Sequence, residues 1–298
     1  LMEGEPMKFF PTPESDLTIA QLPHTRREIF ADICGLYGGS LFRTGLILLA
    51  FALPLLFLGF LADQNELAYL SFAREAADGE RAAIYQEYQL TDSLFSFSGI
   101  IGYMIFAAGL SGAARVIRQH SWEEPVNLKI DLLKGIRQNV KSYLLMGFLT
   151  GCWIFLSRYC FAGALYAQGS RVLVNLLPLL GGLIILLPVL GFSLVTNAVY
   201  SNPFGQNLRM SLLLYLKRPL SSLGIGILMV LLLLLANAVP SIPIRMLLRI
   251  MNIFAAPFLL LAWFLWCSSQ LDRFINPKYY PELVGKGLVK ENTEESGE

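Results

Sequence analysis

Long apolar runs separated by short polar stretches dominate the chain. A helix needs about 20 mostly apolar residues to cross the hydrocarbon core of a bilayer. Six segments reach that length, and their apolar residues are continuous rather than alternating. This pattern favours helices over barrel strands, because in lipid each backbone N–H and C=O has to be paired within the protein. The predicted spans are about 41–62, 94–114, 143–166, 172–198, 220–240 and 246–268.

The polar stretches divide the chain into three regions. Residues 1–40 form an N-terminal segment with an amphipathic helix, 41–270 form the transmembrane domain, and 271–298 form a tail whose polar, acidic end is expected to be disordered. Short connections at 167–171 and 241–245 join the third span to the fourth and the fifth to the sixth. The predicted fold is therefore an all-α polytopic membrane bundle of three helical hairpins.

Two basic amphipathic stretches resemble each other across 80 residues. They are NLKIDLLKGIR (127–137) and NLRMSLLLYLK (207–217), and residues 27–43 form a weaker third copy. Each predicts a cytoplasmic elbow helix that leads into a span and lies in the membrane interface. A true internal repeat and independent selection for amphipathic helices both remain open. The basic residues expected to face headgroups or a partner are Lys129, Lys134, Arg137, Lys141, Arg209, Lys217 and Arg218.

The distribution of charge predicts the orientation in the membrane. Net charge is only +1 with 15% charged residues, so no nucleic-acid partner is expected. Lys and Arg concentrate in the N-terminal approach, in 115–141, in 209–218 and in the tail, which places these segments and both termini in the cytoplasm. Residues 63–93 carry mostly acidic charge and are expected as an external loop. Arg245 and Arg249, which fall on the predicted external side, oppose this orientation. The predicted location of the protein is the bacterial cytoplasmic membrane.

Polar residues within the spans are the candidate functional positions. Arg158 lies well inside the third span, where snorkelling, a structural hydrogen bond and a substrate or partner contact are all open roles. The asparagines near span ends are expected to form interhelical hydrogen bonds. The candidate intramembrane contacts are Arg158, Asn175, Asn197, Asn237 and Asn252, and the small residues that suit close helix packing are Gly109, Gly112, Ala113, Gly147 and Gly151.

Signatures of catalysis are missing from the sequence. The chain has four cysteines and two histidines without zinc-site spacing. It contains no HExxH, P-loop or Gly-x-Ser-x-Gly motif. We therefore expect a non-enzymatic protein with no catalytic residue, metal or cofactor.

Residues 109–155 resemble the YesL-like integral membrane proteins of Gram-positive bacteria. The likeness consists of a small-residue helix end, a basic turn, a Glu-Glu-Pro helix start at Glu123 to Pro125, and an amphipathic elbow before a span. Residues 202–234 are similar to that family's second elbow and span, whereas the acidic stretch 63–93 departs from it. The biochemical activity of this family is not established, so the resemblance assigns no functional residues. Its context implies an association with carbohydrate import by ABC-type systems.

The expected function is an accessory or interaction component of carbohydrate uptake, with the lipid bilayer and ABC permease subunits as partners. One alternative is a small-solute transporter that uses Arg158 as an anion contact. A second alternative is a membrane enzyme acting on lipid-linked substrates, which would need acidic or metal-binding clusters at the inner interface.

Overall fold

The computed structural model describes residues 23–77, 80–164 and 169–288, and all regular structure within them is helical. The predicted disordered end, the first part of the N-terminal segment and the start of the turn after the third span lie outside these residues. The helices are α1 (Arg26–Glu75), α2 (Arg81–Ser121), α3 (Leu128–Ala164), α4 (Ser170–Gly181), a π-helix (Gly182–Leu186), α5 (Leu187–Val199), α6 (Phe204–Lys217), α7 (Pro219–Asn237), α8 (Ile242–Phe274), α9 (Asn276–Tyr279) and a 3₁₀ turn (Pro281–Leu283).

Five helical segments are long and apolar enough to cross a membrane, by length and composition. They are α1, most of α2, most of α3, the continuous α4–π–α5 unit and α8. Helix α7 corresponds to the predicted fifth span, and within its described residues the apolar stretch is Pro219–Leu228. The all-α prediction is therefore confirmed for the described residues, and the five helices are compatible with a multi-pass membrane bundle.

Helix α1 begins with a capping box and runs past the predicted first span. The Thr25 hydroxyl accepts a hydrogen bond from the Glu28 N–H, and the Glu28 carboxylate accepts from the Thr25 N–H. A kink at Tyr37 (φ −116°, ψ 15°) separates the first three turns from the apolar remainder. Of the expected external stretch 63–93, residues 63–75 end α1 and residues 81–93 begin α2, since Leu, Ala, Glu and Gln favour helix.

The three similar basic stretches adopt three different backbones. Residues 128–137 continue directly into the span within α3, so no separate elbow exists there. Helix α6 is a true elbow: Arg218 leaves the helix at φ −145° because Pro219 follows, and a residue before proline disfavours helical angles. Residues 27–43, the weaker third copy, are bent only at Tyr37 within α1. Amphipathic pattern alone therefore did not determine whether the helix breaks.

Small residues bring α2 and α3 together, as the sequence predicted. A β-carbon added at Gly147 would lie 2.6 Å from the Tyr103 carbonyl oxygen, and one at Gly151 would lie 2.7 Å from the Ile100 Cα. A β-carbon added at Gly112 would likewise lie 2.8 Å from Leu132 of α3. The two backbones approach as closely as glycine permits, the usual basis of helix association in lipid.

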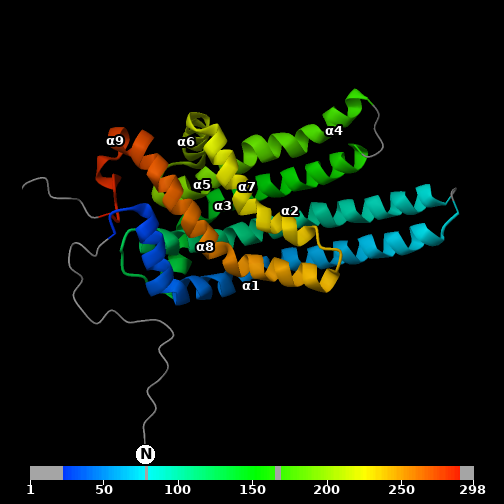
Figure 1. The fold of residues 1–298 in the computed structure, drawn as a ribbon, viewed down its shortest axis with the longest axis horizontal. Helices are drawn as coiled ribbons and strands as arrows, with labels where there is room; N and C mark the ends of the chain where they lie inside the picture. The colour runs from blue at the N-terminus through cyan, green and yellow to red at the C-terminus, as the bar shows by residue number, and fades with distance from the viewer. Residues whose placement is uncertain (1–22, 78–79, 165–168, 289–298) are drawn as a thin grey trace, which may run out of the picture.

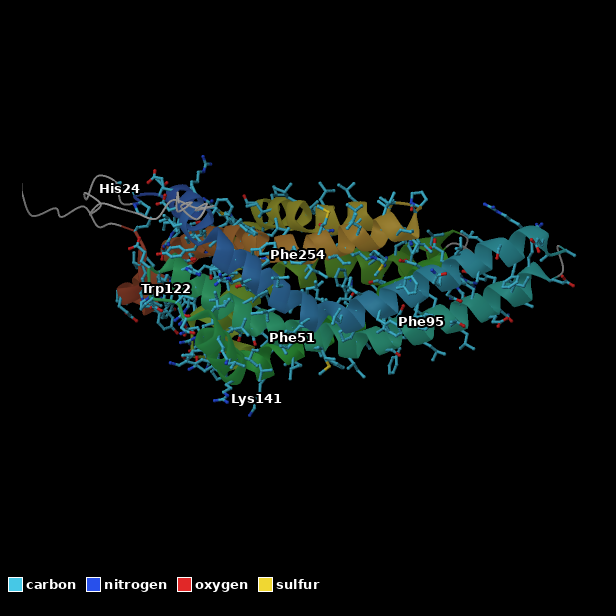
Figure 2. All side chains as sticks on the ribbon, turned by 90° about the horizontal axis from the view of Figure 1, so that it is seen from below. His24, Phe51, Phe95, Trp122, Lys141 and Phe254 are labelled. Carbon is cyan, nitrogen blue, oxygen red and sulfur yellow. The ribbon has the colours of Figure 1, made fainter. Side chains whose placement is uncertain are left out.

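The bundle has two distinct ends (Figure 1). At the terminal end, the start of α1, the α2–α3 turn, the α5–α6 connection and α9 lie together. At the far end, the end of α1 and the start of α2 project beyond the ends of the other helices (Figure 1). The side view shows the same extended α1–α2 pair (Figure 2). The two ends of the bundle are therefore formed by different segments of the chain.

Candidate functional site

Charged residues fall at two levels along the helices. Arg43 and Asp63 are 20 positions apart in α1, which corresponds to about 30 Å at the helical rise of about 1.5 Å per residue. Arg249 and Asp272 in α8 are 23 positions apart, about 35 Å. These separations match the hydrocarbon thickness of a bilayer. The far-end charges and the terminal-end charges are thus spaced as the two faces of an apolar layer.

The far end contains a buried carboxylate held by two arginines. Asp63, only 5% exposed, accepts hydrogen bonds from Arg245 Nη1 at 2.7 Å and from Arg249 Nη1 and Nη2 at 2.7 and 3.1 Å. Arg245 also contacts the Glu66 carboxylate at 3.0 Å, and Arg249 donates to the Asn237 Oδ1 at 2.7 Å. We call these five residues the far-end cluster. It ties α1 to α8 and to the end of α7.

Sequence reasoning missed this cluster. Arg245 and Arg249 had been counted as charges that oppose the predicted orientation, and Asp63 as part of an acidic loop. The available signal was two arginines four positions apart, which share one helix face. The two arginines lie at the start of the apolar run of α8, and Asp63 lies at the end of the apolar run of α1. Nothing in one sequence indicates that these borders touch across more than 180 positions.

Arg158 pairs with a carboxylate of the neighbouring helix. Its Nη2 atom lies 2.5 Å from the Asp92 Oδ1 atom. The Arg158 side chain is 48% exposed and the Asp92 side chain only 17%, so the arginine approaches from the outside of the pair. Of the roles left open by the sequence, a structural hydrogen bond is the one that the geometry shows.

The four candidate asparagines have separate surroundings. Asn237 joins the far-end cluster, whereas Asn197 is buried near the terminal end, where its amide donates to the Ser193 carbonyl and its oxygen accepts from Asn207. A β-carbon at Gly163 would come within 3.2 Å of the Asn175 amide, which places Asn175 against α3. Asn252 is half-buried within α8. The predicted contacts therefore do not converge on one site.

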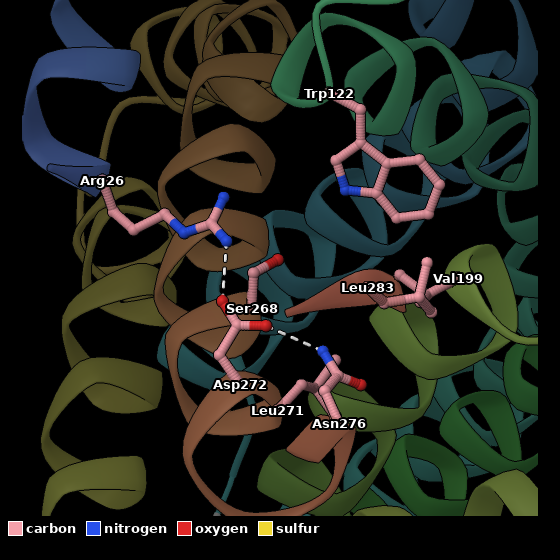
Figure 3. A pocket seen from close by; sticks show the side chains of 8 residues that line it. All are labelled: Arg26, Trp122, Val199, Ser268, Leu271, Asp272, Asn276 and Leu283. Carbon is pink, nitrogen blue, oxygen red and sulfur yellow. Dashed lines mark hydrogen bonds and ion pairs between the residues drawn. The ribbon is translucent and has the colours of Figure 1, made fainter. Parts of the chain in front are cut away.

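The terminal end holds a second polar cluster around Asp272 of α8. Arg26 Nη2 lies 2.7 Å from one carboxylate oxygen, and the Asn276 amide donates to the other at 2.8 Å (Figure 3). The Tyr200 hydroxyl donates to Asn276 Oδ1, and burial raises the pKa of that phenol. The adjoining cavity, lined in part by Trp122, measures about 10 Å³, room for about one water molecule.

The C-terminal segment is anchored at the same place. The Lys286 ammonium lies 3.2 Å from the Glu124 carboxylate and 4.0 Å from the centroid of the Trp122 ring. Arg26 donates to the Lys286 carbonyl oxygen at 2.9 Å. The start of α1, the α2–α3 turn and the C-terminal segment thus form one connected junction.

The seven predicted basic elbow residues face outward. Six are exposed and Arg218 is half-buried, and within the described part of the chain none of them forms an ion pair. Among the described residues there is also no group of three or more His, Cys, Asp or Glu side chains that could hold a metal ion. Available positive charge therefore gathers at the terminal end, whereas the far-end cluster is internally paired.

Comparisons with known proteins find no match for this chain among family models, curated proteins or solved structures. The resemblance to the YesL-like proteins stays a prediction.

Proposed function

We propose that the chain is a multi-pass protein of the bacterial cytoplasmic membrane with six spans in three hairpins and the terminal end in the cytoplasm. The positive-inside rule supports this orientation. The four basic segments meet at the terminal end, through contacts such as Arg26 with Asp272, Lys286 with Glu124, and Arg118 with the Ala198 carbonyl. Helix α7, as the fifth span in chain order, would bring the total to six.

Cysteine labelling tests the orientation. Glu80→Cys and Lys134→Cys are made separately in a chain without its four native cysteines, and both positions are exposed. A membrane-impermeant thiol reagent applied to intact cells is expected to label position 80 and not position 134. The opposite pattern would show that the orientation is inverted.

We further propose a non-enzymatic accessory component that docks another membrane protein. The observation that carries this is the far-end projection of α1 and α2. Leu70 and Phe72 are 45% and 61% exposed, although they lie about 10 Å or more beyond Asp63 along α1. A contiguous exposed apolar patch outside the lipid layer is typical of an interaction surface. Stacked rings of Tyr69 and Tyr88 stiffen the same projection.

The proposed partner is a permease subunit of a carbohydrate ABC importer. This choice rests on the resemblance of residues 109–155 and 202–234 to the YesL-like proteins. Pairing of Arg158 with Asp92 and of Arg245 and Arg249 with Asp63 supports an accessory role over solute binding, since these cations already have anionic partners.

Cross-linking in native membranes followed by purification tests this proposal. A permease subunit is expected to copurify with the wild type and to be lost from L70S/F72S. Glu87→Gln is the matched control on the same projection, because Glu87 is exposed and polar. Recovery of the subunit with all three proteins would contradict docking through the apolar projection.

A solute transporter is the second candidate, favoured by the π-helical segment in the fourth span. The π-helix Gly182–Leu186 lies near the middle of this span between Pro178 and Pro188. A π-helical turn within an α-helix occurs frequently at functional sites. Sugar or anion flux into proteoliposomes that contain this chain alone, abolished by Arg158→Ala, would establish transport and reject the accessory role. An enzyme acting on lipid-linked substrates would instead show turnover of such a lipid in the same proteoliposomes.

A further inference from the structure

Two arginines from different helices lie against one phenyl ring at the terminal end. The Arg218 guanidinium carbon is 6.0 Å from the centroid of the Phe274 ring, and that of Arg273 is 5.4 Å from it. Arg218 sits at the break between α6 and α7, where Pro219 holds its backbone out of the helix. Arg273 and Phe274 end α8. The fold therefore brings two cations together that are 55 positions apart in sequence.

Neither guanidinium has an anionic partner within the described residues. Other arginines at this end are paired: Arg26 lies 2.7 Å from the Asp272 carboxylate, and Arg118 lies 4.0 Å from that of Glu124. The nearest carboxylate in sequence to Arg273, that of Asp272, is thus engaged elsewhere. Two cations around one ring repel each other, and a ring supplies only about 1 kcal/mol of attraction at an exposed site. Within the described residues, no carboxylate compensates the positive charges of Arg218 and Arg273.

Apolar side chains adjoin the arginine pair in the chain. Leu216 and Leu220, on either side of Arg218, are 61% and 83% exposed. They belong to the amphipathic helix α6 and to the start of the apolar helix α7. A free phosphate would satisfy only the arginines. A phospholipid supplies both a phosphate for the guanidiniums and acyl chains for the leucines.

We propose that Arg218, Arg273 and Phe274 form a binding site for the headgroup of an anionic phospholipid, with Leu216 and Leu220 against its acyl chains. Guanidinium groups bind phosphate through paired N–H donors, and the phenyl ring holds both of them in place. The site goes beyond the proposed accessory role and does not depend on a partner protein.

Native mass spectrometry of the detergent-purified full chain tests the site by titration with phosphatidylglycerol. R218Q/R273Q is compared with the matched control K134Q/R137Q, which removes two exposed cations from the same end that have no aromatic ring between them. The two arginines would bind the lipid phosphate directly through charge-assisted hydrogen bonds, whereas Lys134 and Arg137 form no part of the proposed site. Loss of Arg218 and Arg273 together is therefore expected to weaken lipid binding about thirtyfold, against a change of less than about threefold in the control.

Two further ligands separate the sources of phosphate. Phosphatidylcholine should bind at least about tenfold more weakly than phosphatidylglycerol, because its headgroup carries no net charge. Millimolar inorganic phosphate should not displace the lipid. Equal loss of affinity in both double variants, equal binding of the two lipids, or displacement by free phosphate would each overturn the proposal. If R218Q/R273Q does not fold, the single variant Arg273→Gln, at an exposed position, decides the result with an expected loss of about fivefold.

Discussion

Replacing Asp63 by Asn should destabilise the bundle more than any other single charge change at the far end. The carboxylate accepts three charge-assisted hydrogen bonds from Arg245 and Arg249 and is 5% exposed. Removing one member of a buried ion pair costs about 3–5 kcal/mol, because the remaining charge stays buried without compensation. Arg245 retains Glu66 and Arg249 retains Asn237, so we expect the lower limit, about 3 kcal/mol.

Glu66→Gln is the matched control within the same cluster. Glu66 also contacts Arg245, but its side chain is 46% exposed. An exposed pair of this kind contributes about 0–1 kcal/mol. The two variants remove one negative charge each from the same place, so they differ mainly in burial and in the number of hydrogen bonds lost.

Thermal unfolding in detergent, followed by tryptophan fluorescence, measures both variants. A loss of 1 kcal/mol lowers the midpoint by roughly 2 °C for a chain of this size. Asp63→Asn is therefore expected to lower it by about 6 °C and Glu66→Gln by less than about 2 °C. Equal shifts would refute the claim that burial determines the effect. An unchanged midpoint for Asp63→Asn would refute the cluster itself.

Three other changes test separate parts of the structure. Gly147→Leu should lower the unfolding midpoint and separate α2 from α3, whereas Gly224→Leu, with no atom within 4 Å of its added β-carbon, should leave the midpoint unchanged. Trp153→Phe removes the hydrogen bond from the indole to the Pro178 carbonyl and should cost about 1 kcal/mol in the same assay. Because burial raises the pKa of Tyr200, its contribution to stability is complete below pH about 10 and is lost above it; Tyr200→Phe should flatten that alkaline loss in a pH series of melting curves.

Sequence reasoning succeeded where one helix and its solvent determine the answer. The apolar runs predicted the helices, and Gly147 and Gly151 predicted a close helix contact, because each pattern reports a local requirement. It succeeded less where two helices had to be placed together. Arg158 had three open roles until its contact with Asp92 was visible, since a single sequence does not reveal which neighbour faces a side chain.

The similar stretches at 127–137 and 207–217 show how far sequence similarity reaches. Both are amphipathic, yet their matching asparagines form different hydrogen bonds. The Asn127 side chain accepts a hydrogen bond from the Ile130 N–H at the start of α3, whereas Asn207 is buried inside α6 and donates to Asn197. The proline that follows Arg218 has no counterpart after Arg137. These differences weigh against a shared structural role, although the basic faces remain alike.

The far-end cluster also bears on the charge pattern of the sequence. Arg245 and Arg249 opposed the predicted orientation only while each was counted as an isolated cation. Asp63 and Glu66 balance both of them, so the cluster adds no net positive charge to the far end. The seven elbow cations have no such balance within the described residues. The exposed elbow cations at the terminal end therefore favour the proposed orientation, with that end in the cytoplasm.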